Sequence, residues 1–448
     1  MILPEEVKDC LERLEKAGFS AYVVGGCVRD ALLGLSPHDY DLCTGATPEQ
    51  TKQVFAGENL VLAGEKHGTV GVVTAGGVVE ITTFRTEGGY RDGRHPGWVA
   101  FAPRVEDDLA RRDFTVNAMA FSPSRGLIDP FGGRQDLENR VLRAVGEPER
   151  RFQEDALRIL RGARFAVCYG LRPQEETLRA MASRRELLAR ISAERIFSEL
   201  NRLLLQIRAE ELLTFEPILT QVLPELAPTV GFDQHSPHHA YDLFTHTAYV
   251  TAAVPPDPAL RWAALLHDVG KVSAFTLDEN GRGHFHGHAR LSARMAEEVL
   301  LRLKAPTALR EEAVNLIARH MTPLEPDKKL LRRRMGSWGP EAVKKELALQ
   351  RADTSAKGVI GDAPDYDRIE SLLEEILAED ACLTVKDLAV NGRDLMTLGY
   401  VPGPALGVCL DALLGLVADE LLPNEKQALL DQAAQWLPVP EDGKIGKP

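Results

Sequence analysis

The hydrophobic pattern of this 448-residue chain changes near residue 146, and this change limits the possible folds more than any other feature. Before it, short β-branched runs such as 69–74 and 78–84 predict strands, and Thr47, followed by proline and then glutamine at the third position, predicts a helix start. After it, apolar residues recur at helical spacing, for example over 192–205. We therefore predict an α+β N-terminal part followed by an all-α remainder.

The chain is longer than one hydrophobic core usually supports, so we expect several domains. Changes in composition place their boundaries. The predicted domains comprise residues 1–145, 146–234, 235–360 and 361–448. The final segment, 438–448, is rich in proline, glycine and charge and predicts a disordered tail.

The composition excludes several classes of protein. Apolar residues make up 44% and charged residues 27% of the chain, as in soluble globular proteins. The sequence has no secretory signal pattern and no apolar run of membrane-spanning length, and its six cysteines are dispersed, so we expect a cytoplasmic protein with reduced thiols and no membrane partner. A net charge of −13 disfavours indiscriminate nucleic-acid binding but allows a local basic surface. Nothing in the sequence indicates an oligomeric state.

Two aspartates, Asp39 and Asp41, lie one residue apart in a segment where 40–42 predicts a strand. In an extended strand, residues i and i+2 point to the same face, which would set the two carboxylates side by side with Tyr40 turned into the core. The like charges repel unless a divalent cation binds between them. The pair therefore predicts a metal site, although Asp-x-Asp alone also occurs in surface turns.

A glycine pair precedes the aspartates. Gly25 and Gly26 are the last two residues of a strand expected over 23–26, and they would let the backbone N–H groups approach a phosphate closely. Arg29 is expected to hold the same triphosphate. Together with the paired carboxylates, this pattern suggests nucleotidyl transfer with Mg²⁺ ions that polarise the α-phosphate and activate a 3′-hydroxyl. Glu80, in the neighbouring predicted strand, is the candidate for a third metal-binding carboxylate.

These residues resemble motif A of the class II tRNA nucleotidyltransferase and bacterial poly(A) polymerase family, within the polymerase β-like superfamily. Four further segments resemble the family's later motifs, in family order. Motif A matches GGCVRD…HDYDL, and motifs B to E match RRDFTVNA (111–118), IDPFGGRQDL (128–137), EDALRILRGARFA (154–166) and SAERIFSEL (192–200). The resemblance implies an N-terminal nucleotidyltransferase palm over 1–145, followed by a helical neck, body and tail.

The family resemblance also implies an activity and partners. The implied activity is template-independent addition of C, C and A to the 3′ end of tRNA from CTP and ATP, with the tRNA acceptor arm bound through its phosphates by basic residues of the helical half. The resemblance further implies that Arg112 and Asp113 contact the ribose and phosphates and that Asn117 supports them. Addition of A alone and poly(A) synthesis are alternatives within the same chemistry.

Motif D offers a physical means of base selection. Asp155 and Arg158 are three residues apart and are expected to share one helix face, with Glu154 orienting the guanidinium. Cytosine and adenine each present an amino donor beside a ring-nitrogen acceptor, which an Asp acceptor beside an Arg donor would match. Arg161 completes the predicted nucleotide-binding set. The alternative is an ordinary salt bridge on a helix surface.

Nine of the twelve histidines fall between residues 235 and 320. Six residues follow the order H…HD…H…H…D, which resembles the HD metal-dependent phosphohydrolase superfamily. They are His246, His267, Asp268, His288, His320 and Asp353. Such mixed imidazole and carboxylate ligands suit Mn, Fe or Ni, or Mg in a weaker site. The predicted activity is hydrolysis of phosphomonoesters or cyclic phosphates, with Lys271 holding the anion.

Several alternatives for this histidine-rich domain and for the whole chain stay open. The domain could have lost its activity and only support RNA binding, or it could carry the main activity beside a silent palm. The whole chain could also be an RNA-binding protein that retains the fold without catalysis. Five histidines of this stretch match no role in either motif set, and we expect them at the surface or behind the ligands: His235, His238, His239, His284 and His286.

Overall fold

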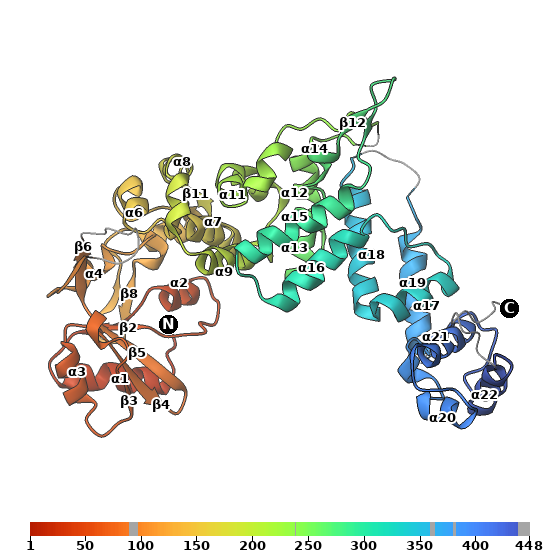
Figure 1. Ribbon diagram of the computed structural model, residues 1–448. Helices are drawn as coiled ribbons and strands as arrows, with labels where there is room; N and C mark the ends of the chain where they lie inside the picture. Colours follow the sequence, from red (N-terminus) through yellow and green to blue (C-terminus); the bar gives the residue numbers. More distant parts are fainter. Residues whose placement is uncertain (89–96, 238, 359–362, 380–381, 438–448) are drawn as a thin grey trace. The chain divides into compact units, whose positions relative to one another are not determined.

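The structure, a computed structural model, describes residues 1–88, 97–237, 239–358, 363–379 and 382–437 (Figure 1). It divides into two units. Unit 1 comprises Met1–Pro228 with Val299–Pro306, and unit 2 comprises Thr229–Glu298 with Thr307–Pro448. The four predicted domains are a finer division and stay a prediction. The tail expected at 438–448 and His238 lie outside the described residues.

Unit 1 is built on a seven-stranded mixed sheet (Figure 1). In spatial order its strands are β3 (Leu60–Val61), β4 (Thr69–Thr74), β5 (Gly77–Thr83), β2 (Leu42–Thr44), β1 (Ala21–Val24), β8 (Ala120–Ser122) and β9 (Gly126–Ile128). All neighbours are antiparallel except β2 and β5, which run parallel with Leu42 opposite Ile81. β1 is buried along its whole length, as its sequence AYVV favours.

Helices of unit 1 cover this sheet and continue beyond it. They are α1 (Glu5–Lys16), α2 (Gly26–Leu32), α3 (Pro48–Val54), α4 (Val105–Leu109), α5 (Gly133–Glu138), α6 (Pro148–Glu154), α7 (Leu157–Tyr169), α8 (Glu175–Ser183), α9 (Ala193–Leu204), α10 (Ala209–Thr214) and α11 (Glu216–Val222). The predicted start of α3 is confirmed, because Thr47 and Gln50 form a reciprocal capping box. Two small ladders accompany them, β6 (Arg85–Gly88) with β7 (Trp98–Phe101) and β10 (Val141–Leu142) with β11 (Arg172–Pro173).

Some strand predictions hold and others shift. β4 occupies the predicted range 69–74, and β5 nearly matches 78–84. The strand expected over 23–26 ends at Val24, because Gly25 adopts a φ of +80° and the chain turns there into α2.

The expected strand over 40–42 is wrong. β2 begins only at Leu42, so Asp39 and Asp41 lie in the irregular segment that precedes the strand. Tyr40 is half-buried and not a full core residue. A hydrogen bond from the end of β1 fixes the residue before β2, because the N–H of Val24 donates to the carbonyl of Asp41 at 2.9 Å.

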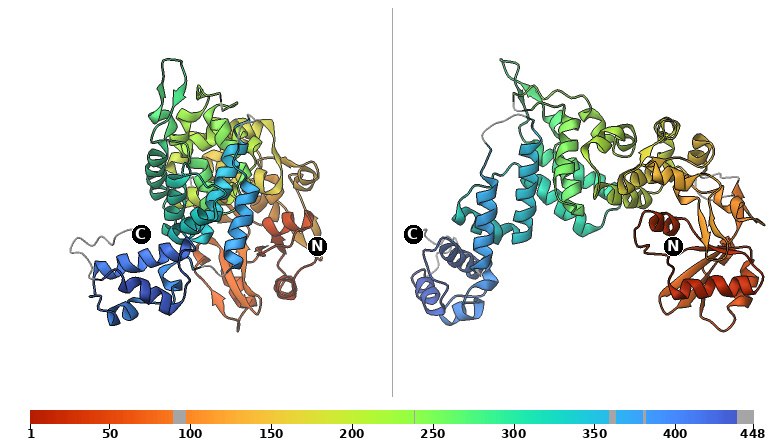
Figure 2. Two further views of the ribbon diagram at one scale, coloured as in Figure 1. Left: turned by 90° about the vertical axis from the view of Figure 1, so that its right-hand side faces the viewer. Right: turned by 180° about the vertical axis from the view of Figure 1, so that it is seen from behind.

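Unit 2 is almost entirely helical. Its elements are α12 (Leu243–Ala253), α13 (Pro258–Leu266), α14 (Lys271–Ala274), β12 (Thr276–Leu277), β13 (Gly283–His284), α15 (His288–Arg302, whose last turn belongs to unit 1), α16 (Thr307–Arg319), α17 (Lys328–Trp338), α18 (Pro340–Ser355), α19 (Tyr366–Ala378), α20 (Gly392–Thr397), α21 (Pro404–Ala418) and α22 (Lys426–Ala434). The last three helices pack around Leu395, Tyr400, Leu413 and Leu429, and they form the blue bundle in Figure 2.

The predicted α+β head and all-α remainder are therefore confirmed, apart from the two-residue strand β11 and the short β12–β13 ladder. No helix within the described ranges is long and apolar enough to cross a membrane.

The core of unit 2 contains a buried carboxyl group on α18. Glu346 is fully buried, and its Oε1 accepts a hydrogen bond from Gln350 Nε2 at 3.2 Å. Its Oε2 has no hydrogen-bond partner among the described residues. Burial raises the pKa of Glu346 to about 8, while Gln350 and Arg319 lower it only in part. The folded protein therefore binds a proton there that the unfolded chain releases.

We expect Glu346→Gln to remove a pH-dependent destabilisation. Because the folded pKa lies above the unfolded one, wild-type stability falls as the pH rises from about 4.5 to about 8, by up to about 1.4 kcal/mol per pH unit. Denaturant unfolding at pH 5.5, 6.5 and 7.5 measures the free energy of unfolding, and the value for the variant should rise relative to that of wild type at each higher pH. The matched control is Glu341→Gln on the exposed face of α18. Parallel curves for wild type and Glu346→Gln would contradict this account.

Candidate nucleotide and metal sites

The glycine turn after β1 brings an arginine close to the backbone. Gly25 has a φ of +80°, and its N–H donates to the carbonyl of Met119 at 3.0 Å. A Cβ at Gly25 would lie 2.6 Å from a guanidinium nitrogen of Arg112. The left-handed φ therefore favours glycine at this turn, and the missing Cβ leaves room for the guanidinium of Arg112.

Asp39 and Asp41 are both exposed, and Asp41 lies beside the residue before this turn, because its carbonyl accepts from the N–H of Val24. Although Asp41 keeps exposed surface, protein atoms packed around its carboxyl group remove part of its solvation and raise its pKa. The charge of Arg112 lowers the pKa and that of Asp39 raises it, so the three groups lie within electrostatic reach of one another. A pair of repelling, accessible carboxylates fits a divalent cation such as Mg²⁺.

Glu80 lies on β5, beside the strand that the aspartates lead into. The parallel register pairs Leu42 with Ile81, which sets Glu80 level with Asp41. The side chain of Glu80 is exposed, opposite in orientation to buried Ile81. Among the described residues, however, Asp39, Asp41 and Glu80 do not form a group with all ligand atoms within 4.8 Å. Glu80 as a third ligand stays a prediction.

Arg29 differs from the expectation of a free phosphate-binding side chain. It is only 5% exposed, and its Nε donates to Asp30 at 2.8 Å and its Nη1 to Asn117 at 2.6 Å. Its Nη2 donates to the hydroxyl of Tyr169, and the guanidinium lies 3.9 Å from the centroid of that ring. Arg29 thus joins α2 to Asn117 and to the end of α7.

Asp113 is likewise engaged within the protein. Its Oδ1 accepts from Asn117 Nδ2 at 3.1 Å, and its Oδ2 accepts from Arg161 Nε at 2.8 Å. Burial favours the neutral carboxyl group, but Arg161, Arg158 and Asn117 outweigh it and lower the pKa of Asp113 to about 2. A continuous hydrogen-bond chain therefore runs from Tyr169 through Arg29, Asn117 and Asp113 to Arg161.

A carboxylate that the motif analysis missed holds the arginine pair of motif B. Asp108 on α4 is 1% exposed, and its Oδ1 accepts from Arg111 Nε at 3.0 Å. Its Oδ2 lies 3.5 Å from Arg112 Nη2, and its Oδ1 also accepts from the N–H of Arg85 at 3.3 Å. An acidic residue four positions before Arg112 was the only signal in the sequence.

Motif D does not form one helix as expected. α6 ends at Glu154 and α7 begins at Leu157, because Asp155 adopts an extended conformation (φ −140°, ψ 104°). Asp155 and Arg158 therefore do not share a helix face. The expected contact between Glu154 and Arg158 is present, because Glu154 Oε2 accepts from Arg158 Nη1 at 3.0 Å and so orients the guanidinium.

The break between these helices is held by contacts of Asp155. Its Oδ1 accepts from the N–H of Leu157 at 3.0 Å, in the manner of a helix N-cap. Its Oδ2 accepts from Arg195 Nη2 at 3.1 Å, across to α9. Arg195 lies in the segment that resembles motif E, but no local pattern predicted this pairing.

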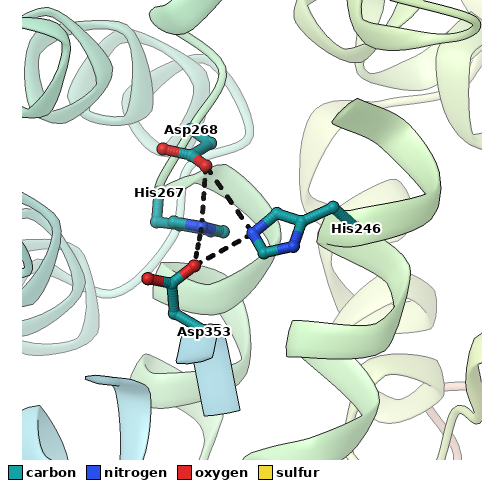
Figure 3. A group of neighbouring side chains, drawn as sticks. All are labelled: His246, His267, Asp268 and Asp353. Atoms are coloured by element: carbon teal, nitrogen blue, oxygen red, sulfur yellow. Dashed lines mark ion pairs between the residues drawn. The ribbon is translucent and has the colours of Figure 1, made fainter. Parts of the chain in front are cut away.

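The six residues of the HD pattern lie together in unit 2. His246 on α12, His267 at the end of α13, Asp268 after it and Asp353 on α18 point toward a common centre (Figure 3). His246 Nε2 lies 3.0 Å from Asp353 Oδ1, and His267 Nε2 lies 3.1 Å from Asp268 Oδ2.

A second group shares Asp268 with the first. It comprises Asp268, His288 at the start of α15 and His320 after α16. Asp268 Oδ1 lies 3.3 Å from His288 Nε2 and 3.7 Å from His320 Nε2, whereas its Oδ2 faces His267. Each oxygen of one carboxylate thus faces a different set of ligands.

The histidine rings are oriented as metal ligands are. Each Nδ1 lies within hydrogen-bond distance of a main-chain carbonyl, at 3.3 Å for His246, 2.8 Å for His267, 2.8 Å for His288 and 2.6 Å for His320. This leaves every Nε2 turned inward. The Nε2 atoms of His288 and His320 lie 3.2 Å apart, a contact between two lone pairs in neutral rings that a cation would relieve.

Unsatisfied atoms in this cluster also fit a metal. His246 Nε2, His267 Nε2 and both oxygens of Asp268 are buried and lie at ion-pair distances from one another, from Asp353 and from Lys271, but among the described residues they form no hydrogen bond of regular geometry. Burial alone would raise the pKa of Asp268, but His267 and Lys271 hold it well below the usual range. Burial likewise opposes ionisation of Asp353, and His246 and His267 lower its pKa. The donor set suits a divalent transition metal.

Three separate parts of the chain match known protein families. Residues 21–143 match the poly A polymerase head domain, and residues 170–229 match the probable RNA and SrmB-binding site of polymerase A. Residues 243–357 match the HD domain. The resemblance to motif A and that to the HD pattern thus each correspond to a separate family model.

Similarity to individual proteins extends over nearly the whole chain. A CCA-adding enzyme of Streptococcus thermophilus is 36% identical over 435 residues, covering 96% of each chain. One of Levilactobacillus brevis is 36% identical, covering 96% of this chain and 98% of the relative. The crystal structure of the Bacillus stearothermophilus CCA-adding enzyme in complex with CTP is 31% identical with a TM-score of 0.70, covering 97% of this chain and 98% of that one.

Asp113→Asn is expected to destabilise the protein by about 2 kcal/mol at pH 7. The folded pKa lies below the unfolded value, so this contribution is present above about pH 4 and is lost as the pH falls toward 2. Denaturant unfolding at pH 7 and at pH 3 measures it, and the difference from wild type should shrink at the lower pH. Glu138→Gln, in an exposed ion pair with Arg134, is the control and should cost less than about 0.5 kcal/mol. Equal losses in both variants would refute the claim.

Proposed function

The chain belongs to the CCA-adding enzyme family and is a tRNA nucleotidyltransferase, and on that premise we propose that it adds C, C and A to the 3′ end of tRNA from CTP and ATP. The observation that carries the proposal is the exposed pair Asp39 and Asp41 beside the glycine turn, with Arg112 held next to them. Basic residues of the helical half would hold the tRNA acceptor arm through its phosphates.

In this proposal Asp39 and Asp41 hold Mg²⁺, with Glu80 as the third carboxylate. Bound there, the ions would polarise the α-phosphate and lower the pKa of the attacking 3′-hydroxyl. Burial raises the pKa of Asp41 most, repulsion by Asp39 adds to it, and the charge of Arg112 opposes both and favours an ionised ligand.

The nucleotide would be held by two kinds of residue. The N–H groups of Gly25 and Gly26, together with Arg112, are proposed to contact the phosphates directly. Arg29, Asp113, Asn117 and Arg161 are proposed to act as the frame beneath them, because their donors and acceptors are already engaged with one another. This revises the expectation that Arg29 and Asp113 contact the nucleotide themselves.

Base selection is proposed to involve Asp155 and Arg158. Glu154 fixes the Arg158 guanidinium, which also donates to the carbonyl of Arg111 at 2.8 Å. Asp155 already accepts from Leu157 and Arg195, but each carboxylate oxygen can accept a further hydrogen bond. An amino group of cytosine or adenine could therefore bind without displacing Arg195.

The proposal is tested with three tRNA substrates that end at the discriminator base, at C and at CC. Each is offered with each of the four NTPs separately and with CTP and ATP together, and product lengths are read on a gel. We expect C to be added to the first two substrates and A to the third. Addition of A alone, with no use of CTP, would indicate an A-adding enzyme, and long A tracts would indicate a poly(A) polymerase.

Asp41→Asn should abolish these additions while leaving the fold intact. Loss of one ligand charge from the proposed metal pair is expected to lower the rate at least about 1000-fold, which is roughly 4 kcal/mol of barrier. Single-turnover incorporation of CMP measures the rate, and circular dichroism checks the fold. The control is Asp129→Asn, outside the metal pair. Near-wild-type incorporation by Asp41→Asn would refute the assignment.

A second candidate function is metal-dependent phosphohydrolysis in unit 2. The observation that favours it is the set of buried, inward-facing ligand atoms of His246, His267 and Asp268, which form no hydrogen bond of regular geometry among the described residues. We propose that the HD residues hold up to two divalent ions, with one oxygen of Asp268 for each. A bound metal would supply a hydroxide nucleophile at neutral pH.

Two variants of the HD site should lose metal to different degrees. Asp268→Asn removes the carboxylate shared by both groups and is expected to weaken Mn²⁺ binding at least about 100-fold at both positions. Asp353→Asn should leave the group of Asp268, His288 and His320 able to hold one ion. Equilibrium dialysis followed by elemental analysis gives the number of ions per chain. Equal metal content in wild type and Asp268→Asn would exclude this site.

A further inference from the structure

Asp155, the carboxylate proposed to read the incoming base, is held by residues of two different helices. It lies in the extended break between α6 and α7. Its Oδ1 accepts from the N–H of Leu157 at 3.0 Å, and its Oδ2 accepts from Arg195 Nη2 at 3.1 Å. The first contact is local, whereas the second comes from a residue forty positions further along the chain. The plane of the carboxylate is therefore fixed by α9 as well as by α7.

The guanidinium of Arg195 serves this one contact. Within the part of the chain that the structure describes, Asp155 is the only side chain with which Arg195 forms a hydrogen bond or an ion pair. Its Nη1 is buried and forms no hydrogen bond of regular geometry with any described residue. The side chains of Arg195 and Asp155 are only 25% and 19% exposed, so water screens their attraction in part. Arg195 is thus directed at Asp155 and at no other acid.

The position of Arg195 in its own helix is unfavourable. It is the third residue of α9, which begins at Ala193, and so it lies in the first turn. The N-terminal end of a helix carries partial positive charge, and a cation there is disfavoured by about 0.3–1 kcal/mol. The ion pair with Asp155 offsets this repulsion. The partner outside the helix therefore explains why an arginine stands at this position, and α9 itself does not.

A second ion pair joins α7 to α9 without involving the base-reading carboxylate. Arg164 Nε donates to Glu199 Oε2 at 2.5 Å, and both side chains are largely buried. Neither residue forms a hydrogen bond or an ion pair with Asp155 among the residues described. The two helices therefore have a connection that is independent of Arg195. This pair provides a matched comparison for the effect of simply loosening α9 from α7.

Rejection of the wrong bases requires a carboxylate that stays in place. Cytosine and adenine present an amino group beside a ring-nitrogen acceptor, and uracil and guanine present a carbonyl oxygen beside an N–H donor. A carbonyl oxygen is repelled by a carboxylate that cannot move away. If Asp155 were held only by the N–H of Leu157, its free oxygen could turn from the base, and the penalty against uracil and guanine would fall. The contact with Arg195 prevents this rotation.

We propose that Arg195 is a positioning residue for base selection, which holds Asp155 against the pairing edge of the incoming nucleotide. It acts through Asp155 and contacts neither the nucleotide nor a metal ion. The proposal rests on the proposed base selection by Asp155 and Arg158, and it adds a residue of α9 as a determinant of specificity. It accounts for the arginine in the first turn of α9 and for the extended break that places Asp155 within its reach.

Arg195→Gln tests this role through the ratio of correct to incorrect nucleotide. The values of kcat/KM are measured for CTP and UTP on tRNA that ends at the discriminator base, and for ATP and GTP on tRNA that ends at CC. Both ratios are expected to fall at least about 10-fold, because the wrong base is no longer met by a fixed carboxylate. A merely structural role would lower the melting temperature and slow all four nucleotides alike. Ratios equal to those of wild type would overturn the proposal.

Glu199→Gln is the matched control, because it removes one charge from the other ion pair between α7 and α9. It is expected to lower the melting temperature and to leave both nucleotide ratios at their wild-type values. If Glu199→Gln lowers the ratios as much as Arg195→Gln does, the effect comes from loosening the two helices, and the specific role of Arg195 is refuted.

Asp155→Ala separates this inference from the function on which it rests. If this variant discriminates as wild type does, base selection by Asp155 fails, and the role of Arg195 fails with it. If Asp155→Ala loses discrimination while Arg195→Gln keeps it, only the role of Arg195 is overturned. In the double variant, Arg195→Gln should lower the ratios no further than Asp155→Ala alone, because its action passes through Asp155. A further loss in the double variant would contradict the proposal.

Thermal melting and circular dichroism check that each variant is folded at the assay temperature. If Arg195→Gln is unfolded there, Arg195→Met keeps the packing of the aliphatic stem without a donor and repeats the measurement. The same fall in both ratios is expected, and unchanged ratios in that variant overturn the proposal.

Discussion

An aspartate removed from water must be paired with positive charge or hydrogen-bond donors, and both candidate sites are built around this requirement. In unit 1, Asp113 is paired by Arg161, Arg158 and Asn117, which lower its pKa to about 2 and use both of its oxygens. In unit 2, Asp268 lies at ion-pair distance from Lys271, His267 and His288, yet neither of its oxygens forms a hydrogen bond of regular geometry among the described residues. The first site is closed by the protein's own side chains, while the second is open to a cation.

The closed network explains how the nucleotide site can be rigid before a nucleotide arrives. Arg29, Asn117 and Asp113 connect α2, the turn after Phe114 and α7 through hydrogen bonds that need no ligand. The groups left exposed are the carboxylates of Asp39 and Asp41. Preorganised groups of this kind bind a charged ligand without first having to rearrange.

Features fixed by local interactions were predicted from the sequence, and features fixed by distant partners were not. The start of α3 depends on residues three apart, and β4 depends on its own β-branched run, so both predictions are confirmed. The break at Asp155 depends on Arg195, forty residues away, so a continuous helix was predicted and was wrong. The HD residues were found because their order along the chain follows a known pattern, and the structure brings them together. No sequence pattern predicted the contacts of three other residues, because their partners come close only in the folded chain. These residues are Asp108, Tyr169 and Gln234.

The central claim is that the paired carboxylates before β2 receive the metal while the buried network beneath them stays intact. A crystal structure of the chain with CTP and Mg²⁺ tests this directly. The account predicts a metal ion about 2.1 Å from oxygens of both Asp39 and Asp41 and in contact with the triphosphate, with the Asp113–Arg161 pair unchanged. A triphosphate bound away from these aspartates, or a metal held instead by Asp113 after its separation from Arg161, would contradict it.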